Sequence, residues 1–269
     1  MKIVFIGDIV GRPGRNAVRD KLSEVQSREG ADIVLANAEN AAGGAGLTPD
    51  IAEELFAHGV DLITLGNHAW AKREIMGYLD SSLRPVLRPL NLPGTPPGKG
   101  SAVVDLGGTK VAVMSVAGRV FATTHYDCPF RTALAEVERL RRETPVIVVD
   151  FHGEATSEKA ALAWYLDGKV SAVLGTHTHV QTADERVLPG GTAFLTDVGM
   201  TGPSQGIIGM DKDLALERFL TQMPVRLEVA GGPAVFSAVV VDIDPATGKT
   251  RGIGRILEHV SVRHGTQET

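Results

Sequence analysis

The sequence predicts an α/β fold in which two mixed sheets pack face to face with helices on the outside. Short apolar, strand-like runs alternate with helix-like stretches along most of the 269-residue chain. A hairpin pattern interrupts this alternation near the middle of the chain, and further strand patterns fill its C-terminal part. A single parallel sheet would need neither the hairpin nor the C-terminal strands, so two sheets are the better prediction.

The first part of the chain alternates strands with helices. Thr48 followed by Pro49 marks one helix start, because a threonine side chain caps free N–H groups and proline is tolerated at the first helical position. That helix is expected to end near His58-Gly59. The other elements expected here are a strand at 3–6, a Gly/Pro loop at 11–14, a helix at 15–28, a strand at 33–36, a Gly-rich loop at 43–46, a strand at 62–65 and a helix through the seventies.

The second part begins with a Pro/Gly-rich connector at 85–100. Runs at 103–106 and 111–116 flank Gly107-Gly108, which is the pattern of a hairpin. The remaining expected elements are strands at 145–149, 170–174, 193–195, 225–229, 236–243 and 253–260, and helices near 130–142, 156–166 and 211–222. No stretch has the composition of a domain linker, so residues 1–269 are predicted to form one domain.

Composition and charge narrow the functional classes. With 43% hydrophobic and 22% charged residues, the chain has the composition of a soluble globular protein. With a net charge of −5, the chain lacks the excess of positive charge that binding to the phosphate backbone of a long nucleic acid requires. The apolar run at 3–6 is too short for a signal-peptide core, and no segment reaches the length of a membrane span. Cys128 is the only cysteine, so we expect no internal disulfide and a cytoplasmic location.

Five short polar segments each follow a predicted strand. In an open α/β sheet the carboxyl ends of strands lie along one edge, so groups far apart in the sequence can converge there. Each segment alone can be explained as ordinary structure, such as a helix cap or a turn. It is improbable, however, that all five would lie at strand ends by chance. We therefore predict one metal site. The segments are Gly7-Asp8, Ala38-Glu39-Asn40, Gly66-Asn67-His68, Phe151-His152 and Gly175-Thr176-His177-Thr178-His179.

The donor atoms in these segments suit two ions. In the last segment, His177 and His179 occupy alternate positions, which share a face if the chain there is extended. Seven donors are too many for one transition metal, but they fit two ions about 3.5–4 Å apart that share a carboxylate. Oxygen and nitrogen donors without sulfur favour Mn, Fe or Zn. The candidate ligands are Asp8, Glu39, Asn40, Asn67, His152, His177 and His179.

The order of these residues resembles that of the calcineurin-like metallophosphoesterases. Within that superfamily the chain is most similar to the YmdB-like branch of bacterial cytoplasmic phosphodiesterases that act on cyclic nucleotides. The resemblance implies a four-layer α/β/β/α fold, a dinuclear metal centre and hydrolysis of phosphoesters. The segments that carry it are Phe5–Gly11, Ala36–Asn40, Phe151–Lys159, Gly175–Glu185 and Thr196–Pro203.

Three departures from the superfamily pattern affect the ligand assignment. Val10 stands where most members have a histidine, Glu39 where most have an aspartate, and Ala69 where many have an acid. Asn40 offers an oxygen in place of the imidazole missing at Val10. The resemblance then implies one ion held by Asp8, Glu39, Asn40 and His179, and a second held by Glu39, Asn67, His152 and His177.

His68 is left outside both ligand sets. An imidazole beside a metal-bound Asn67 is placed to protonate a leaving alkoxide, although a purely structural His68 is the alternative. The absence of an acid at Ala69 leaves the group that orients His68 unassigned. Arg12, in the predicted Gly/Pro loop, could contact a substrate phosphate, although exposed loop arginines are usually solvated.

Two other side chains near the site receive weaker assignments. Glu154 lies two residues beyond His152 and is expected to orient a ligand without touching the metal. Lys159 is expected on the solvated face of a helix.

The predicted function is that of a dinuclear metal-dependent phosphodiesterase. Its substrates would be small phosphodiesters of the 2′,3′-cyclic nucleotide type, attacked at phosphorus by a metal hydroxide. Fe or Mn is the favoured metal, with Zn or Mg as alternatives. A regulatory protein that binds a nucleotide or a partner and keeps residual activity is the rival, and an RNA endonuclease is a third reading. The sequence is compatible with a homo-oligomer.

Overall fold

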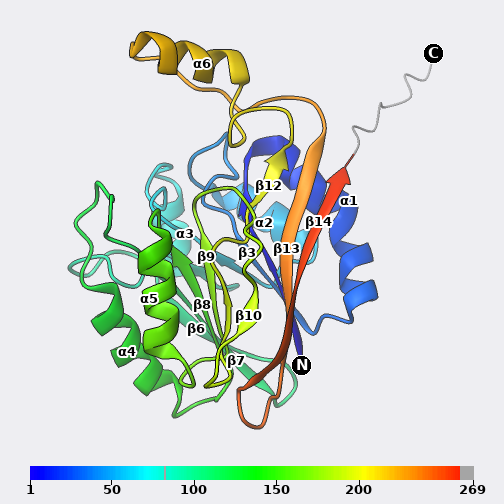
Figure 1. The fold of residues 1–269 in the computed structure, drawn as a ribbon, viewed down its shortest axis with the longest axis vertical. Coiled ribbons are helices and arrows are strands. Elements are labelled where there is room, and N and C mark those ends of the chain that lie inside the picture. Colours follow the sequence, from blue (N-terminus) through cyan, green and yellow to red (C-terminus); the bar gives the residue numbers. More distant parts are fainter. Residues whose placement is uncertain (82, 261–269) are drawn as a thin grey trace.

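The computed structural model describes residues 1–81 and 83–260, and two mixed sheets form its centre (Figure 1). The eight-stranded sheet has the order β2 (Asp8–Ile9), β12 (Met200–Pro203), β13 (Ala234–Ile243), β1 (Lys2–Ile6), β3 (Ile33–Asn37), β4 (Leu62–Thr64) and β5 (Val86–Leu87), with β14 (Thr250–Val260) paired to β13. The six-stranded sheet has the order β10 (Arg186–Val187), β11 (Ala193–Leu195), β9 (Ala172–Thr176), β8 (Ile147–His152), β7 (Lys110–Ala117) and β6 (Ser101–Asp105).

Parallel pairing brings the ends of the important strands to one edge. In the larger sheet, β1 pairs in parallel with β3, and β3 with β4. In the smaller sheet, β7, β8 and β9 pair in parallel in the same way. The polar segments after β1, β3, β4, β8 and β9 therefore leave the carboxyl edges of the two sheets, as the sequence predicted.

The two sheets pack on each other because both faces of their central strands are apolar. Alternate residues of a strand point to opposite faces. In β1, Ile3 and Phe5 join the buried cluster between the sheets, whereas Val4 and Ile6 face the helices. Strands covered on both faces have continuous apolar runs. The expectation of two mixed sheets between outer helices is confirmed.

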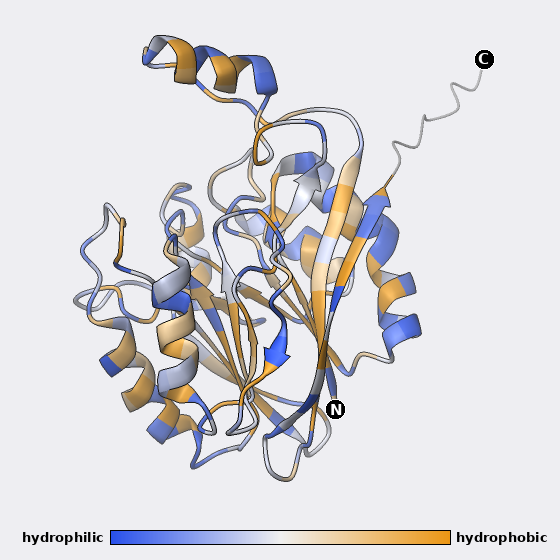
Figure 2. Ribbon diagram, viewed as in Figure 1, coloured by the Kyte–Doolittle hydropathy of each residue, from blue (hydrophilic) through white to orange (hydrophobic). Residues whose placement is uncertain are grey.

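Helices form the two outer layers. The larger sheet is covered by α1 (Gly11–Glu29), α2 (Pro49–Ala57) and α3 (Ile75–Ser81), and the smaller by α4 (Pro129–Leu140) and α5 (Thr156–Leu166). By contrast, α6 (Lys212–Thr221) stands away from the sheets and buries only Ala215 (Figure 1). Figure 2 shows the strands as mainly hydrophobic and α6 as a mixture of hydrophobic and hydrophilic residues. Among the described residues, no helix combines the length and apolar character needed to cross a membrane.

Some element boundaries differ from the sequence-based expectation. The predicted loop at 11–14 is the first turn of α1, because Pro13 lies where backbone N–H groups have no helical partner to lose. The cap at Thr48 is confirmed, since its side chain accepts a hydrogen bond from the Ile51 N–H. The predicted strand at 225–229 is wrong. This segment returns from α6, and only Val229 forms an isolated bridge, with Met210.

Candidate metal centre

The five polar segments meet where the carboxyl edges of the two sheets face each other. Asp8, beyond β1, accepts a hydrogen bond from the backbone N–H of His177, beyond β9, at 3.1 Å. Glu39, beyond β3, lies with Oε1 3.1 Å from Nε2 of His152 at the end of β8. The structure thus brings all seven predicted ligands to one region, with contributions from both sheets.

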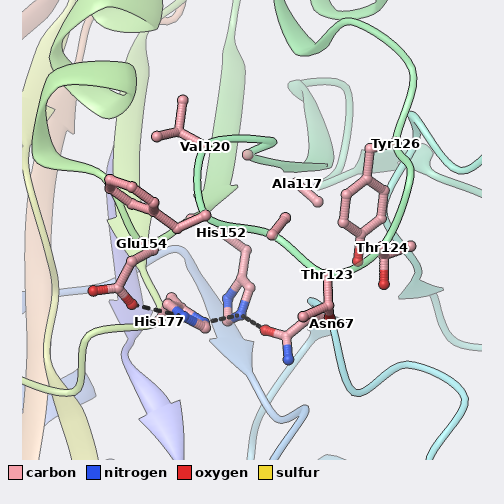
Figure 3. A pocket seen from close by; sticks show the side chains of 13 residues that line it. Asn67, Ala117, Val120, Thr123, Thr124, Tyr126, His152, Glu154 and His177 are labelled. Atoms are coloured by element: carbon pink, nitrogen blue, oxygen red, sulfur yellow. Dashed lines mark hydrogen bonds and ion pairs between the residues drawn. The ribbon is translucent and has the colours of Figure 1, made fainter.

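His152 is the centre of one group of donors. Its Nε2 lies 2.8 Å from Oδ1 of Asn67 and 3.0 Å from Nδ1 of His177. Figure 3 shows these three side chains converging, with Glu154 beside His177. Glu39, His152 and His177 each offer a ligand atom, and these atoms lie within 4.8 Å of one another. The group matches the ligand set that the resemblance implies for the second ion.

Asp8 is the centre of the other group. Its Oδ1 lies 3.9 Å from Nε2 of His179, and the Asn40 amide lies 3.2 Å from the same nitrogen. Asp8 Oδ1 is buried and has no hydrogen-bond partner among the described residues. Leaving a buried carboxylate oxygen unpaired is costly, so a partner is expected there. A cation at this position would supply that partner, and the residues present therefore fit a metal.

The charges of the site also call for a cation. Burial raises the pKa of Asp8 to about 6. Burial alone would raise the pKa of Glu39, but His152, with help from His68, outweighs it and brings the pKa to about 2. Burial alone would lower the pKa of His152, but attraction to Glu39 and Asp8 raises it to about 9. Burial and the charge of His152 lower the pKa of His177 to about 4. The buried carboxylates therefore favour a positive charge beside them.

The backbone passes very close to the donors at Gly66. An added Cβ at this position would overlap the side chains of both His152 and Glu39. Only glycine lets the segment after β4 pass close enough to the site for the next residues, Asn67 and His68, to enter it.

His68 is held by two residues of the neighbouring segment. Its backbone N–H donates to Oε2 of Glu39 at 3.0 Å, and its Nδ1 lies 2.7 Å from Oδ1 of Asn40. The side chain is 42% exposed, so the ring is accessible to a substrate. Asn40 is thus the orienting neighbour of His68 that the sequence left unassigned.

The two histidines of the last segment do not share a face. Both follow the end of β9 with a left-handed backbone, at φ 104° for His177 and φ 66° for His179. The expectation of an extended H-x-H segment is therefore wrong. The turn sends His177 toward His152 and His179 toward Asp8, so that each histidine joins a different group of donors.

This turn is fixed by a buried ion pair that the sequence did not reveal. Lys159 is fully buried in α5 and donates to Oδ2 of Asp197 at 2.7 Å. The same oxygen accepts hydrogen bonds from the backbone N–H and the hydroxyl of Thr178, between the two histidines. The prediction of a solvated Lys159 is wrong, because α5 turns this side chain inward to a carboxylate.

A second buried carboxylate supports His152. Asp150 accepts hydrogen bonds from the hydroxyls of Thr64 at 2.5 Å and Thr176 at 2.7 Å, and from the amide of Asn37 at 3.0 Å. The Thr176 hydroxyl lies 2.9 Å from Nδ1 of His152. A carboxylate inside the apolar run of β8 was the signal in the sequence that could have identified Asp150.

The remaining candidate residues are placed as follows. Glu154 lies with Oε2 3.1 Å from Nε2 of His177, which is the orienting contact expected of it. Arg12 is exposed in the first turn of α1 and does not line the pocket beside His152 and His177. A role for Arg12 in substrate binding stays a prediction.

Known proteins resemble this chain along nearly its whole length. The family model described as YmdB-like protein matches residues 4–256. The 2′,3′-cyclic-nucleotide 2′-phosphodiesterase of Bacillus subtilis (strain 168) is 49% identical over 257 residues, which are 96% of this chain and 97% of the relative.

Solved structures share the fold as well. A hypothetical protein from Thermus thermophilus has a TM-score of 0.91 at 43% identity, over 97% of this chain and 100% of the other. A structure described as a novel phosphatase from Mycoplasma pneumoniae has a TM-score of 0.91 at 33% identity, over 97% of this chain and 94% of the other.

Proposed function

The chain belongs to the YmdB-like protein family, and from this premise we propose that it is a dinuclear metal-dependent phosphodiesterase of the metallophosphoesterase type. Its proposed substrates are small phosphodiesters of the 2′,3′-cyclic nucleotide type, which is the substrate class in the name of the Bacillus subtilis relative. The observation that carries the proposal is that Glu39 contacts His152 of one donor group and Asn40 of the other, while a buried oxygen of Asp8 has no hydrogen-bond partner among the described residues.

Two sets of residues would hold the ions. When bound, two divalent ions polarise phosphoryl oxygens and lower the pKa of a coordinated water, and Fe or Mn suits these donors. Burial removes competing water from the carboxylates, and the two supporting networks fix the histidines. The first set is Asp8, Glu39, Asn40 and His179, and the second is Glu39, Asn67, His152 and His177.

The Asn40 amide links metal binding to proton donation. Its oxygen lies 2.7 Å from Nδ1 of His68, so this ring nitrogen carries a proton and donates to the oxygen. When both ring nitrogens are protonated, His68 can give its Nε2 proton to the leaving ribose oxygen and ends as a neutral ring with its proton on Nδ1. The same amide oxygen is the atom of Asn40 that would hold the first ion.

A substrate panel with the reconstituted protein tests this function. Protein loaded with Mn or Fe is assayed with 2′,3′-cyclic AMP, 3′,5′-cyclic AMP, bis-p-nitrophenyl phosphate and the monoester p-nitrophenyl phosphate. We expect both 2′,3′-cyclic AMP and the aryl diester to be cleaved with higher kcat/KM than the monoester. Glu39→Gln, which weakens the proposed shared ligand, is expected to abolish both activities. Preference for the monoester, or no turnover with either metal, would overturn the proposal.

A further inference from the structure

We propose that the loop at residues 118–126 is a nucleobase-binding platform, on which Phe121 stacks against the base of a nucleotide whose phosphodiester lies at the metal centre. The inference rests on the proposed function, because it assigns the part of the site that recognises the non-reacting half of the substrate. Stacking on an aromatic ring tolerates every base, since all of them have a π-face.

The pocket joins the two halves of such a substrate. A cavity of about 220 Å³ begins at three of the proposed ligand residues, Asn67, His152 and His177. Its other wall is the loop, which contributes the apolar side chains of Val120 and Phe121. Figure 3 shows Val120 and Tyr126 of this loop above the donor group. A ligand that fills the cavity therefore places an anionic group at one end and an apolar face at the other.

Phe121 combines a highly exposed side chain with an unfavourable backbone conformation. Its side chain is 82% exposed, and its backbone has φ 63°, in the left-handed region that favours glycine. A single exposed aromatic residue needs no explanation by itself. This one lines the cavity and is held in an unfavourable backbone conformation, which is the pattern of a residue positioned for binding.

The two ends of the loop are fixed by one buried residue. Asn91 donates through its amide nitrogen to the carbonyl oxygens of Ala117, at 2.8 Å, and Asp127, at 3.0 Å. Its side-chain oxygen accepts from the N–H of Ala117 at 2.9 Å, and its carbonyl oxygen accepts from the N–H of Asp127 at 2.8 Å. The loop is therefore closed at its base before any ligand binds.

The turn that carries Phe121 is fixed by a second buried residue. The Glu158 carboxylate of α5 accepts hydrogen bonds from the N–H groups of Arg119, at 3.0 and 3.1 Å, and Val120, at 3.1 Å. The N–H of Ala122 donates back to the carbonyl oxygen of Arg119 at 3.1 Å. Because the turn is formed in advance, little conformational freedom remains to be lost when a base stacks on it.

Substitution of Phe121 tests the platform. Two cyclic diesters are compared, 2′,3′-cyclic AMP and glycerol 1,2-cyclic phosphate, which has the reactive group but no base. Phe121→Ala is expected to lower kcat/KM for 2′,3′-cyclic AMP by about 5- to 100-fold, and to change that for the glycerol diester less than about twofold. Phe121→Trp is expected to retain activity on both. Phe219→Ala, at an exposed phenylalanine of α6 far along the chain, is the matched control and should behave as wild type.

A binding measurement separates this inference from the proposed function. Titration calorimetry of the Mn-loaded protein with adenosine 3′-monophosphate is expected to give a Kd about 5- to 100-fold higher for Phe121→Ala than for wild type. Equal losses on both cyclic diesters, or an unchanged Kd, would overturn the platform and leave the phosphodiesterase assignment standing. If wild type cleaves neither diester, the proposed function fails, and the Kd comparison alone still decides the role of Phe121.

Discussion

Single side chains of the site combine chemical and positional roles. The seven proposed ligands were visible in the sequence because each stands at a strand end and has a metal-binding side chain. The roles of Lys159 and Asp150 could not be predicted, because the sequence does not show which buried group a side chain contacts. Their roles depend on contacts with Asp197 and Thr176, which come from distant segments. The left-handed backbone of His177 could not be predicted either, because it depends on contacts with distant segments.

Loss of the His68 ring is expected to separate chemistry from metal binding. His68→Ala keeps the backbone N–H that donates to Glu39, so both ions should remain. Turnover of 2′,3′-cyclic AMP should fall by about 10²- to 10⁴-fold, the usual contribution of a general acid. The loss should be smaller for bis-p-nitrophenyl phosphate, because p-nitrophenolate leaves without a proton. Equal losses on the two substrates would mean that His68 does not donate the proton, and His58→Ala is the control.

A methyl group at Gly66 is expected to destroy the second donor group. Gly66→Ala would force a Cβ into the space of His152 and Glu39, so these side chains must move apart. Metal content is expected to fall by at least one ion per chain, measured by elemental analysis. The control is Gly77→Ala in α3, where no atom lies within 4 Å of the added Cβ. Wild-type metal content in Gly66→Ala would contradict this account of the close approach.

At the scale of elements, long and strongly patterned segments were predicted correctly. The strands β1, β3, β7 and β13 and the helix α2 follow their apolar patterns and caps. The short strands β2, β10 and β12 were missed, because two to four residues show no clear period, although the three-residue strands β4 and β11 were predicted from their apolar residues. The segment at 225–229, wrongly predicted as a strand, has the right alternation but pairs with no strand among the described residues, and strand propensity depends on such a partner.

The contact between α5 and the histidine turn gives an element-scale prediction. Lys159→Met leaves Asp197 as a buried unpaired charge, which is expected to lower the free energy of unfolding by about 3–5 kcal/mol. Because Asp197 also holds Thr178, metal affinity should fall too. Urea unfolding and metal titration measure the two effects. Lys169→Met, at an exposed lysine, is the control, and identical unfolding of the Lys159 and Lys169 variants would refute the positioning role.

At the scale of the whole molecule, the site lies where the carboxyl edges of the two sheets face each other, and it contains residues from both. In the proposed assignment, the larger sheet contributes Glu39 to both ligand sets, and segments of the smaller sheet contribute His179 to the first set and His152 to the second, so each ion would connect the two sheets. Sequence patterns predicted the two sheets and their common edge. The distances across that edge depend on how the sheets pack, and the sequence could not supply them.

Removal of the ions is therefore expected to loosen the whole fold. Ions that bind only the folded state stabilise it by about 2.7 kcal/mol for each site at a concentration 100 times Kd. Treatment with a chelator should lower the Tm in a thermal scan, and added Mn should restore it. Phe121→Ala, outside the ligand sets, should show the same metal-dependent shift as wild type. A Tm that does not respond to chelator would contradict the bridging of the two sheets.

The metal content of the purified protein tests the central claim most directly, namely that seven converging side chains hold two ions. Elemental analysis after mild purification with added Mn is expected to give close to two transition-metal ions per chain. His179→Ala and His177→Ala, one from each donor group, are each expected to retain close to one. A wild-type stoichiometry that never exceeds one ion per chain would contradict the dinuclear centre.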